Sequence, residues 1–168
     1  DEEVPTGVFG ELLSRGPYTI DGYYMAEEAN RTSFTEDGFY RTGDKAMWME
    51  NGRLRMGGRI KEQINRAGEK IMPSEVEGYL CQHPNIKEAA VVGVPDEVLG
   101  NRICAYVMLE VEKQVDLREI HRFLKSIGVA FYKLPDQVES IDFWPLTSVG
   151  KIDKKVLVER ATKKEREI

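Results

Sequence analysis

Ala89-Ala-Val-Val-Gly-Val94, followed by Arg102-Ile-Cys-Ala-Tyr-Val-Met-Leu109, is the stretch of sequence that decides the fold. Both runs are apolar and rich in residues that favour strands. The Pro95-Asp96 pair after the first run is a turn signal. The two runs therefore predict neighbouring β-strands joined by a turn.

Helix signals lie on both sides of these strands. Ser74 and Glu77 have the spacing of a capping box, with which a helix often begins. Asp116 precedes a second helix, which Gly128 ends, and Asp153 begins a third near the C-terminus. Apolar residues recur at helical spacing within these segments.

Helices and strands alternate over residues 59–168, where a further strand is expected near residues 138–141. This alternation predicts a compact α+β domain with a small sheet flanked by helices. A short hairpin is expected near its start, where Ala67-Gly-Glu69 separates residues 62–66 from residues 70–72.

Residues 1–58 have a different pattern, with short strands and turns and little helix. A strand is expected over residues 9–14 and one short helix over residues 25–30. Asn51-Gly52 between two extended runs predicts a hairpin with a type I′ turn. Because this segment has few apolar residues for a core of its own, we interpret it as the β-rich end of a larger N-terminal domain.

The composition excludes several classes of protein. The 168-residue chain carries a net charge of −5, which argues against non-specific binding to nucleic acid. It contains no apolar run of membrane-spanning length and no secretory leader at its start. Two cysteines are too few for a disulfide framework, so a cytoplasmic location and no membrane association are expected.

A metal site is not expected from the cysteines and histidines. Cys81 and His83 are near neighbours, but the other candidate ligands, Cys104 and His121, are scattered along the chain. A closed zinc site needs four ligands in a compact spacing. We interpret these residues as packing residues.

Asp44 and Arg59 are candidate nucleotide-binding residues. A carboxylate beside a glycine, as in Thr42-Gly43-Asp44, can accept hydrogen bonds from both hydroxyls of a ribose. The fixed fork of the Arg59 guanidinium suits a phosphate or a ribose. The alternatives are a turn aspartate and a solvated arginine at a change in composition.

Lys61 and the Ala67-Gly68 pair are candidates for conformational and binding roles. Lys61 lies where the composition changes, at a place suited to an interdomain hinge. Gly68 lacks a Cβ atom, so the backbone of the turn can approach a ligand closely. The alternative for Ala67-Gly68 is a plain hairpin turn.

Lys151 is the candidate catalytic residue. It lies in Pro145-Leu-Thr-Ser-Val-Gly-Lys151, a loop of mostly small residues ahead of the last helix. Its ammonium group can hold a carboxylate and a phosphate as a point charge. A phosphate loop of the Walker type is excluded, because that motif requires glycine where Pro145 stands and Ser or Thr where Ile152 stands. The alternative is a surface turn with a solvated lysine.

Taken together, these motifs resemble the C-terminal part of adenylate-forming enzymes, the superfamily of acyl-CoA synthetases, luciferases and nonribosomal-peptide adenylation domains. The resemblance covers essentially the whole chain. The motifs that carry it are Gly10-Glu-Leu12, Gly22-Tyr-Tyr24, Tyr40-Arg-Thr-Gly-Asp44, Gly58-Arg59, Ile71 to Glu77, Leu134-Pro135 and Pro145 to Lys151.

Three further segments are similar to the aryl-acid–AMP ligases of siderophore synthesis, which act on 2,3-dihydroxybenzoate or salicylate. They are Arg15 to Thr19, Glu62 to Arg66 with Gly68-Glu-Lys70, and Tyr132 to Asp136. Ala67 departs from the glycine expected in the aryl-acid ligases, and Lys61 departs from the aspartate common at the hinge of adenylation domains.

The resemblance implies a two-step reaction. ATP and a carboxylic acid give an acyl-adenylate and pyrophosphate, with Mg2+ present, and the acyl group then passes to a phosphopantetheine thiol of an aryl carrier protein. Asp44, Arg59 and Lys151 would bind ATP or AMP, with Lys151 catalytic in adenylation. Lys61 would be the hinge, and Ala67-Gly68 would face the pantetheine.

The same resemblance implies that the main phosphate loop, the acid pocket and the residues that hold ATP and Mg2+ lie in the N-terminal domain, upstream of this sequence. Residues 1–58 would be the end of that domain, and residues 59–168 the mobile C-terminal domain. Two alternatives within enzymes are an acyl-CoA ligase and an amino-acid adenylation domain. An alternative of another class is a non-catalytic module that docks a carrier protein.

Overall fold

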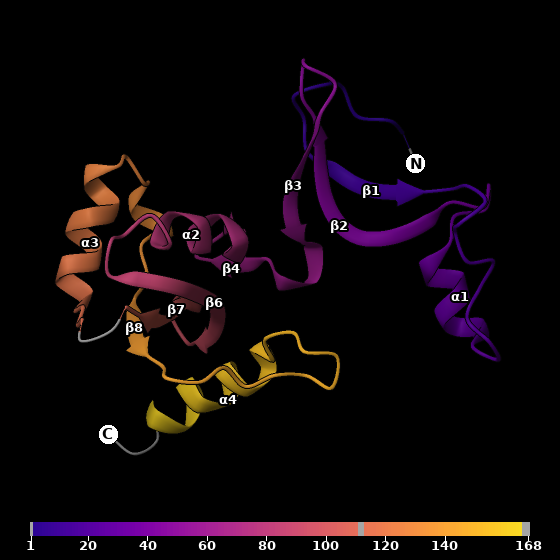
Figure 1. Cartoon of the computed structure of the whole chain (residues 1–168). Coiled ribbons are helices and arrows are strands. Elements are labelled where there is room, and N and C mark those ends of the chain that lie inside the picture. The colour runs from indigo at the N-terminus through magenta and orange to yellow at the C-terminus, as the bar shows by residue number, and fades with distance from the viewer. Residues whose placement is uncertain (1, 111–112, 166–168) are drawn as a thin grey trace. The chain divides into compact units, whose positions relative to one another are not determined.

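The computed structural model describes residues 2–110 and 113–165. The chain divides into two compact units, Asp1–Lys61 and Glu62–Ile168 (Figure 1). The sequence suggests a change of domain after residue 58, and the compact units divide at Lys61. The α+β class predicted for the chain is confirmed, because both helices and sheets are present in the described residues.

The first unit is a three-stranded antiparallel sheet with one short helix. Its strands are β1 (Gly10–Ser14), β2 (Tyr40–Trp48) and β3 (Leu54–Arg59), in the order β1-β2-β3. The helix α1 spans Glu27–Ser33. The predicted strand near residues 9–14 is confirmed, and the predicted helix is present two residues later than expected.

The β2–β3 connection is a hairpin, as predicted, but its turn is not of type I′. Gly52 has a φ of +74°, whereas Asn51 is not among the residues with positive φ. Gly52 N donates a hydrogen bond of 2.9 Å to Met49 O, and Met49 N donates one of 2.8 Å to Arg53 O. This is a longer loop that ends in a single left-handed glycine, a common alternative to the two-residue hairpin.

The second unit contains two sheets. The strands β4 (Ile64–Arg66) and β5 (Glu69–Ile71) form a small antiparallel hairpin. The strands β6 (Ile86–Asp96), β7 (Gly100–Leu109) and β8 (Gln137–Ser140) form a sheet in which β6–β7 is antiparallel and β7–β8 parallel. The helices are α2 (Pro73–Leu80), α3 (Leu117–Ser126) and α4 (Lys154–Glu165), with short 3-10 segments η1 (Ile60–Glu62) and η2 (Phe131–Lys133).

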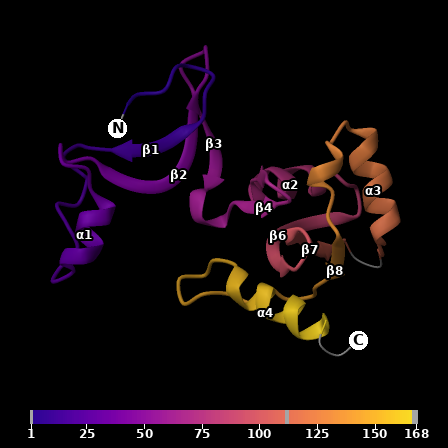
Figure 2. The same ribbon diagram turned by 180° about the vertical axis from the view of Figure 1, so that it is seen from behind.

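Helices cover both faces of the β6–β7–β8 sheet, α2 and α3 on one face and α4 on the other (Figures 1 and 2). Successive strand residues point to opposite faces of the sheet. Because helices cover both faces, the residues on each face are apolar. One core contains Val91, Ala105 and Val107 with Leu80 and Leu124. The other contains Val92, Cys104 and Tyr106 with Leu157 and Ala161.

Helix α4 packs on the sheet through Leu157 and Ala161, both of which are buried. Burying a leucine side chain contributes roughly 1.5–3 kcal/mol. The Tyr106 hydroxyl also donates a hydrogen bond of 2.9 Å to the Leu157 carbonyl oxygen, and burial raises the pKa of Tyr106. The helix that follows the Lys151 loop therefore has a fixed position on the sheet.

Two local predictions were wrong. The β6 strand continues through Asp96, which pairs with Gly100, so the β6–β7 turn lies at residues 97–99 and not at Pro95-Asp96. Helix α2 begins earlier than predicted, with Met72 as its N-cap and without a side-chain cap at that residue. The Glu77 carboxylate accepts a hydrogen bond from Val91 N at 2.8 Å. The predicted caps of the other helices are confirmed, since Asp116 accepts from Glu119 N and Asp153 from Lys155 N.

Candidate active site

Asp44 and Arg59 lie opposite each other on β2 and β3. The distance from Arg59 Nε to Asp44 Oδ1 is 3.1 Å, and Arg59 Nη1 donates a hydrogen bond of 2.6 Å to the Thr42 carbonyl oxygen. Gly43, between these acceptors, has a φ of +72°, which glycine adopts without strain. The predicted nucleotide-binding residues of the first unit are therefore brought together.

The Asp44–Arg59 pair is accessible to a ligand, with 25% of the Asp44 side chain and 50% of the Arg59 side chain exposed. Thr42 helps to orient it, since its hydroxyl donates to Leu12 O at 2.8 Å and accepts from Asp44 N at 3.1 Å. A carboxylate offers about four acceptor positions and a guanidinium five donors. The pair can therefore accept hydrogen bonds from a diol and donate to an anionic oxygen.

Lys61 lies in the short 3-10 segment η1 and is exposed. It is also the last residue of the first compact unit, and Glu62 is the first of the second. A brief irregular segment between two compact units can absorb large changes in φ and ψ. Lys61 thus occupies the covalent link between the units.

Ala67 and Gly68 form the two-residue turn between β4 and β5. Their φ angles are +50° and +89°, so the type I′ geometry that the sequence predicted at Asn51-Gly52 occurs here instead. A Cβ atom placed on Gly68 would meet no atom within 4 Å. The space beside the turn is therefore open for an extended ligand to approach the backbone.

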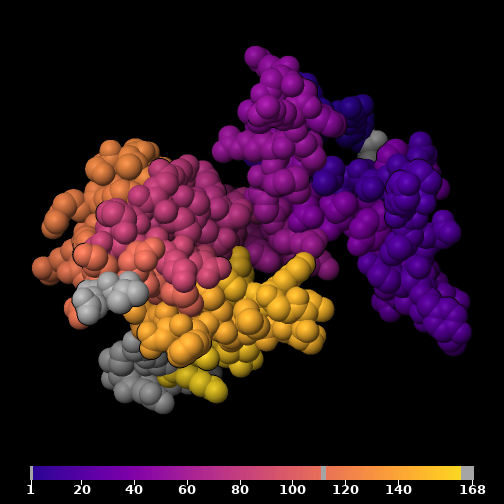
Figure 3. Space-filling view, in the orientation of Figure 1, coloured from indigo at the N-terminus to yellow at the C-terminus, as the bar shows by residue number. Residues whose placement is uncertain are grey.

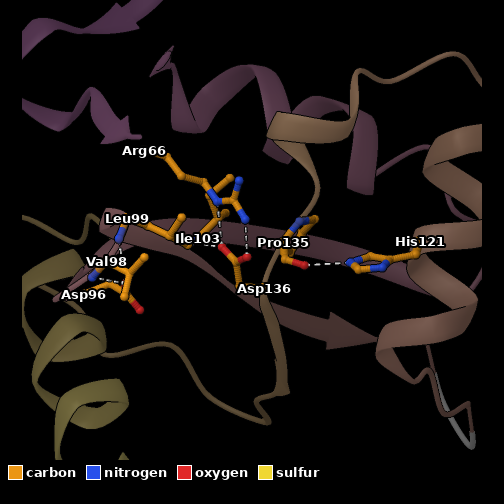
Figure 4. Close-up of polar contacts among 8 residues, drawn as sticks. All are labelled: Arg66, Asp96, Val98, Leu99, Ile103, His121, Pro135 and Asp136. Atoms are coloured by element: carbon orange, nitrogen blue, oxygen red, sulfur yellow. Dashed lines mark hydrogen bonds and ion pairs between the residues drawn. The ribbon is translucent and has the colours of Figure 1, made fainter. Parts of the chain in front are cut away.

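Arg66, the residue before this turn, was not assigned a role from the sequence. Its guanidinium forms two hydrogen bonds with the Asp136 carboxylate, 3.0 Å from Nε to Oδ2 and 2.5 Å from Nη2 to Oδ1 (Figure 4). Both residues belong to segments noted as similar to the aryl-acid ligases. The local sequence carries no signal for this pair, because polar or charged residues flank both Arg66 and Asp136.

Lys151 lies in a loop that forms a small hairpin of its own. Leu146 and Ile152 form an isolated β-bridge, and Thr147 N donates a hydrogen bond of 2.7 Å to Lys151 O. Lys151 N donates to the Thr147 hydroxyl at 3.2 Å, so the backbone on both sides of the lysine side chain is fixed. Figure 3 shows the orange-to-yellow segment near residue 150 projecting from the surface of the second unit.

The Lys151 side chain itself is exposed. Among the side chains that the structure describes, no carboxylate lies within ion-pair distance of its ammonium group. The lysine is therefore available to an external anion, on a loop whose backbone is held in one conformation.

Lys154, three residues further on, is a second residue that the sequence did not single out. Its ammonium lies 2.7 Å from Glu62 Oε2 and 2.8 Å from Glu77 Oε1. Burial acts to lower the pKa of Lys154, but the Glu77 and Glu62 carboxylates outweigh it, so the pKa lies above its ordinary value. Lys154 is therefore charged, and its ammonium is engaged by two carboxylates of the same unit.

A magnesium site is not formed by the described residues. They contain no group of three or more His, Cys, Asp or Glu side chains arranged to hold a metal ion. His83 lies 3.4 Å from Glu119 and His121 shares a hydrogen bond of 2.7 Å with Pro135 O. The residues that the structure describes therefore do not form a site that fits Mg2+. None of the helices in the described ranges is long and apolar enough to cross a membrane.

The fold and the ordered motifs define the class of protein. Residues 75–151 match the family of the AMP-binding enzyme C-terminal domain. These residues belong to that domain family, and the chain as a whole is similar to the C-terminal part of adenylate-forming enzymes.

The chain is similar to two enzymes over nearly its whole length. It is 48% identical to the 2,3-dihydroxybenzoate-AMP ligase of Bacillus subtilis over 164 residues, which cover 98% of the chain and 30% of the relative. It is 47% identical to a salicylyl-CoA synthase / salicylate adenylyltransferase of a Streptomyces species over 157 residues, which cover 94% of the chain and 28% of the relative. The chain thus spans less than a third of the length of these enzymes.

A solved structure agrees with the fold. The ATP-bound MatB of Rhodopseudomonas palustris matches with a TM-score of 0.86 at 31% identity, over 95% of this chain and 31% of that protein. The α+β domain predicted from the sequence is therefore the fold of this part of an adenylate-forming enzyme.

Proposed function

We propose that the chain is the C-terminal part of an aryl-acid–AMP ligase. Such an enzyme joins 2,3-dihydroxybenzoate or a similar aryl acid to ATP, releases pyrophosphate, and transfers the aryl group to a phosphopantetheine thiol. The observation that carries the proposal is the exposed Lys151 on its fixed loop, in a chain 48% identical to a 2,3-dihydroxybenzoate-AMP ligase.

Lys151 is proposed to act in adenylation. In this step a carboxylate oxygen attacks the α-phosphorus of ATP, the bond to pyrophosphate breaks, and negative charge increases on the phosphoryl oxygens. An ammonium group placed between carboxylate and phosphate attracts both and stabilises that charge. Comparable preorganised groups lower the activation free energy by about 3–4 kcal/mol. The lack of a carboxylate partner in the described ranges supports this role.

Asp44 and Arg59 are proposed to bind the nucleotide. The Asp44 carboxylate would accept hydrogen bonds from the ribose hydroxyls, and Arg59 would donate to ribose or phosphate oxygens. Their ion pair of 3.1 Å supports this assignment, because it preorganises both groups.

Lys61 is proposed as the hinge between the end of the N-terminal domain, residues 1–58, and the mobile C-terminal domain, residues 59–168. After adenylation the thiol must reach the position that the Lys151 ammonium occupied. A rotation about Lys61 would withdraw Lys151 and present the Ala67-Gly68 turn to the pantetheine arm. The position of Lys61 at the end of a compact unit supports the assignment.

The partners follow from the reaction. We propose an aryl acid as substrate, an aryl carrier protein as acceptor, and the siderophore pathway in the cytoplasm as the setting. ATP would be bound mainly by the part of the enzyme that this chain does not include. Mg2+ would also be held there, since the described residues offer no cluster of ligands for it.

Coenzyme A is the second candidate acceptor. It ends in the same phosphopantetheine thiol, and a relative 47% identical to this chain is named a salicylyl-CoA synthase. An amino-acid adenylation domain and a non-catalytic docking module have less support, because the lysine loop and the aryl-type segments occur together here.

The test is acid-dependent exchange of pyrophosphate into ATP by the intact enzyme, meaning the polypeptide that joins this chain to the rest of an adenylate-forming enzyme. We expect exchange with hydroxybenzoates to exceed that with fatty acids and amino acids by at least a hundredfold. A preference for fatty or amino acids would reject the aryl assignment, and no exchange with any acid would support the docking module. The rates of aryl transfer to a carrier protein and to coenzyme A are then compared, and the faster reaction identifies the acceptor.

A further inference from the structure

The Arg66–Asp136 ion pair is a partly buried contact within the second unit. Only 16% of the Arg66 side chain and 25% of the Asp136 side chain are exposed. Asp136 Oδ2 also accepts a hydrogen bond of 2.7 Å from Ile103 N, and Asp136 N donates one of 2.8 Å to Ile103 O. The carboxylate that holds Arg66 is therefore itself fixed to strand β7 (Figure 4).

The next residue along the chain is fixed to the same sheet by a separate route. Ala67 N donates a hydrogen bond of 2.7 Å to the Leu99 carbonyl oxygen. Leu99 lies in the β6–β7 turn, whose Val98 N and Leu99 N donate to Asp96 Oδ1 at 3.0 and 2.8 Å. These backbone donors lower the pKa of Asp96. Asp96 thus holds the turn in the conformation in which the Leu99 carbonyl oxygen accepts the hydrogen bond from Ala67 N.

The turn needs such support because its own conformation is uncommon. Ala67 has a φ of +50°, a region that residues with a Cβ atom seldom occupy. No atom lies within 4 Å of the Cβ position of Gly68, so packing on that side does not hold the turn. An arginine–carboxylate pair with two parallel hydrogen bonds fixes direction as well as distance.

We propose that Arg66 and Asp136 are positioning residues for the transfer of the aryl group to the thiol, and that they act through the Ala67-Gly68 turn. This inference rests on the proposed function. The pair holds β4 against β7, so that the turn keeps its geometry while the pantetheine arm lies along it. Neither residue touches the reacting atoms.

The test measures both half-reactions in the intact enzyme. Pyrophosphate exchange reports adenylation, and thioester formation from preformed aryl-adenylate reports transfer. Arg66→Gln is expected to lower kcat/KM for the thiol acceptor at least tenfold and to change exchange less than twofold. Arg66→Lys keeps the charge but loses the fork, so an intermediate loss of transfer is expected.

Two comparisons separate positioning from general damage. Lys133→Gln breaks the Lys133–Glu75 pair, which has a distance of 2.7 Å and exposures of 19% and 32%, and it should leave the ratio of the two half-reactions unchanged. The double variant Arg66→Gln with Asp136→Asn should transfer no more slowly than the worse single variant, because both changes remove the same interaction.

The outcomes distinguish this inference from the proposed function. If the unsubstituted enzyme forms no adenylate with any acid, the proposed function fails. If it performs both steps but Arg66→Gln lowers both equally, or neither, the positioning role is rejected. If thermal melting shows that Arg66→Gln does not fold, Arg66→Lys is used in its place. A loss of transfer without a loss of adenylation in Arg66→Lys then supports the positioning role, and an equal loss of both steps, or of neither, rejects it.

Discussion

The Lys154 ammonium donates a hydrogen bond of 2.7 Å to Glu62 Oε2, although the two residues are 92 positions apart. This contact joins the first residue of α4 to the residue that follows Lys61. Lys154 also lies 2.8 Å from Glu77 of α2. The helix that follows the Lys151 loop is thus tied to the start of the second unit.

Lys154→Met is expected to destabilise the second unit by about 1–3 kcal/mol. The change leaves the Glu62 and Glu77 carboxylates close together without their cation, which costs more than the loss of an exposed pair and less than that of a fully buried one. Urea unfolding measures the effect. Lys155→Met is the matched control, since Lys155 is exposed, and its stability should be unchanged.

The contribution of Lys154 to the free energy of unfolding should decrease at high pH. Its pKa is raised in the folded state, so its stabilising effect is complete below the ordinary lysine pKa of about 10.4 and is lost as the pH rises through the higher folded value. The difference in unfolding free energy between the unsubstituted chain and Lys154→Met should stay constant from about pH 7 to pH 9 and narrow above about pH 10. A difference that widens at high pH would contradict the assignment.

Asp44→Asn is expected to raise the KM for ATP by roughly tenfold to a hundredfold in the intact enzyme. Hydrogen bonds to a charged group are worth about 1.5–3 kcal/mol, and the change also removes the ion pair with Arg59. Initial rates of pyrophosphate exchange against ATP concentration provide the measurement. Glu11→Gln is the control, because it breaks the 2.9 Å Arg41–Glu11 pair on the same sheet, and its KM for ATP should stay within twofold.

Lys61→Pro is expected to impair one half-reaction selectively. Proline fixes φ near −65° and restricts the residue before it, so it should trap one arrangement of the domains, whereas Lys61→Ala leaves the backbone free and should have little effect. Separate assays of adenylation and transfer give the answer. Unchanged rates of both steps in the proline variant would remove the hinge assignment.

Gly68→Ala is expected to slow transfer while leaving adenylation nearly unchanged. The added methyl group meets no neighbouring atom, so the effect comes from the φ of +89° alone, at a cost of about 1–2 kcal/mol. Thioester formation from preformed adenylate is the measurement. Ala67→Gly is the control, because glycine adopts the φ of +50° at this position without strain and should keep the transfer rate.

Much of the fold could be predicted from the sequence. The strands around Val91 and Ala105 are continuous apolar runs, and the helix capped by Asp116 has a clear periodicity, so local pattern decides both. The N-cap of helix α2 is Met72 and not Ser74, and Glu77 takes part in tertiary contacts. Glu77 bonds to Val91 N and to Lys154, and neither partner is visible from the helix's own sequence.

The residues of the candidate site could be selected from the sequence where they lie in short motifs. Asp44, Lys61, Gly68 and Lys151 lie in short motifs whose chemistry can be inferred from neighbouring residues. The supporting contacts were not predictable in this way. Arg66 meets Asp136 across 70 residues, and a single sequence does not show which of its many charges pair over such a separation.

Lys151→Ala in the intact enzyme tests the central claim most directly. Pyrophosphate exchange should fall by about a hundredfold to a thousandfold, while thioester formation from preformed aryl-adenylate should stay within a few-fold. Lys155→Ala, which removes another exposed ammonium group from the neighbouring helix, should leave both rates unchanged. If Lys151→Ala exchanges pyrophosphate at the unsubstituted rate, or loses both steps equally, Lys151 is not the adenylation residue and the account is contradicted.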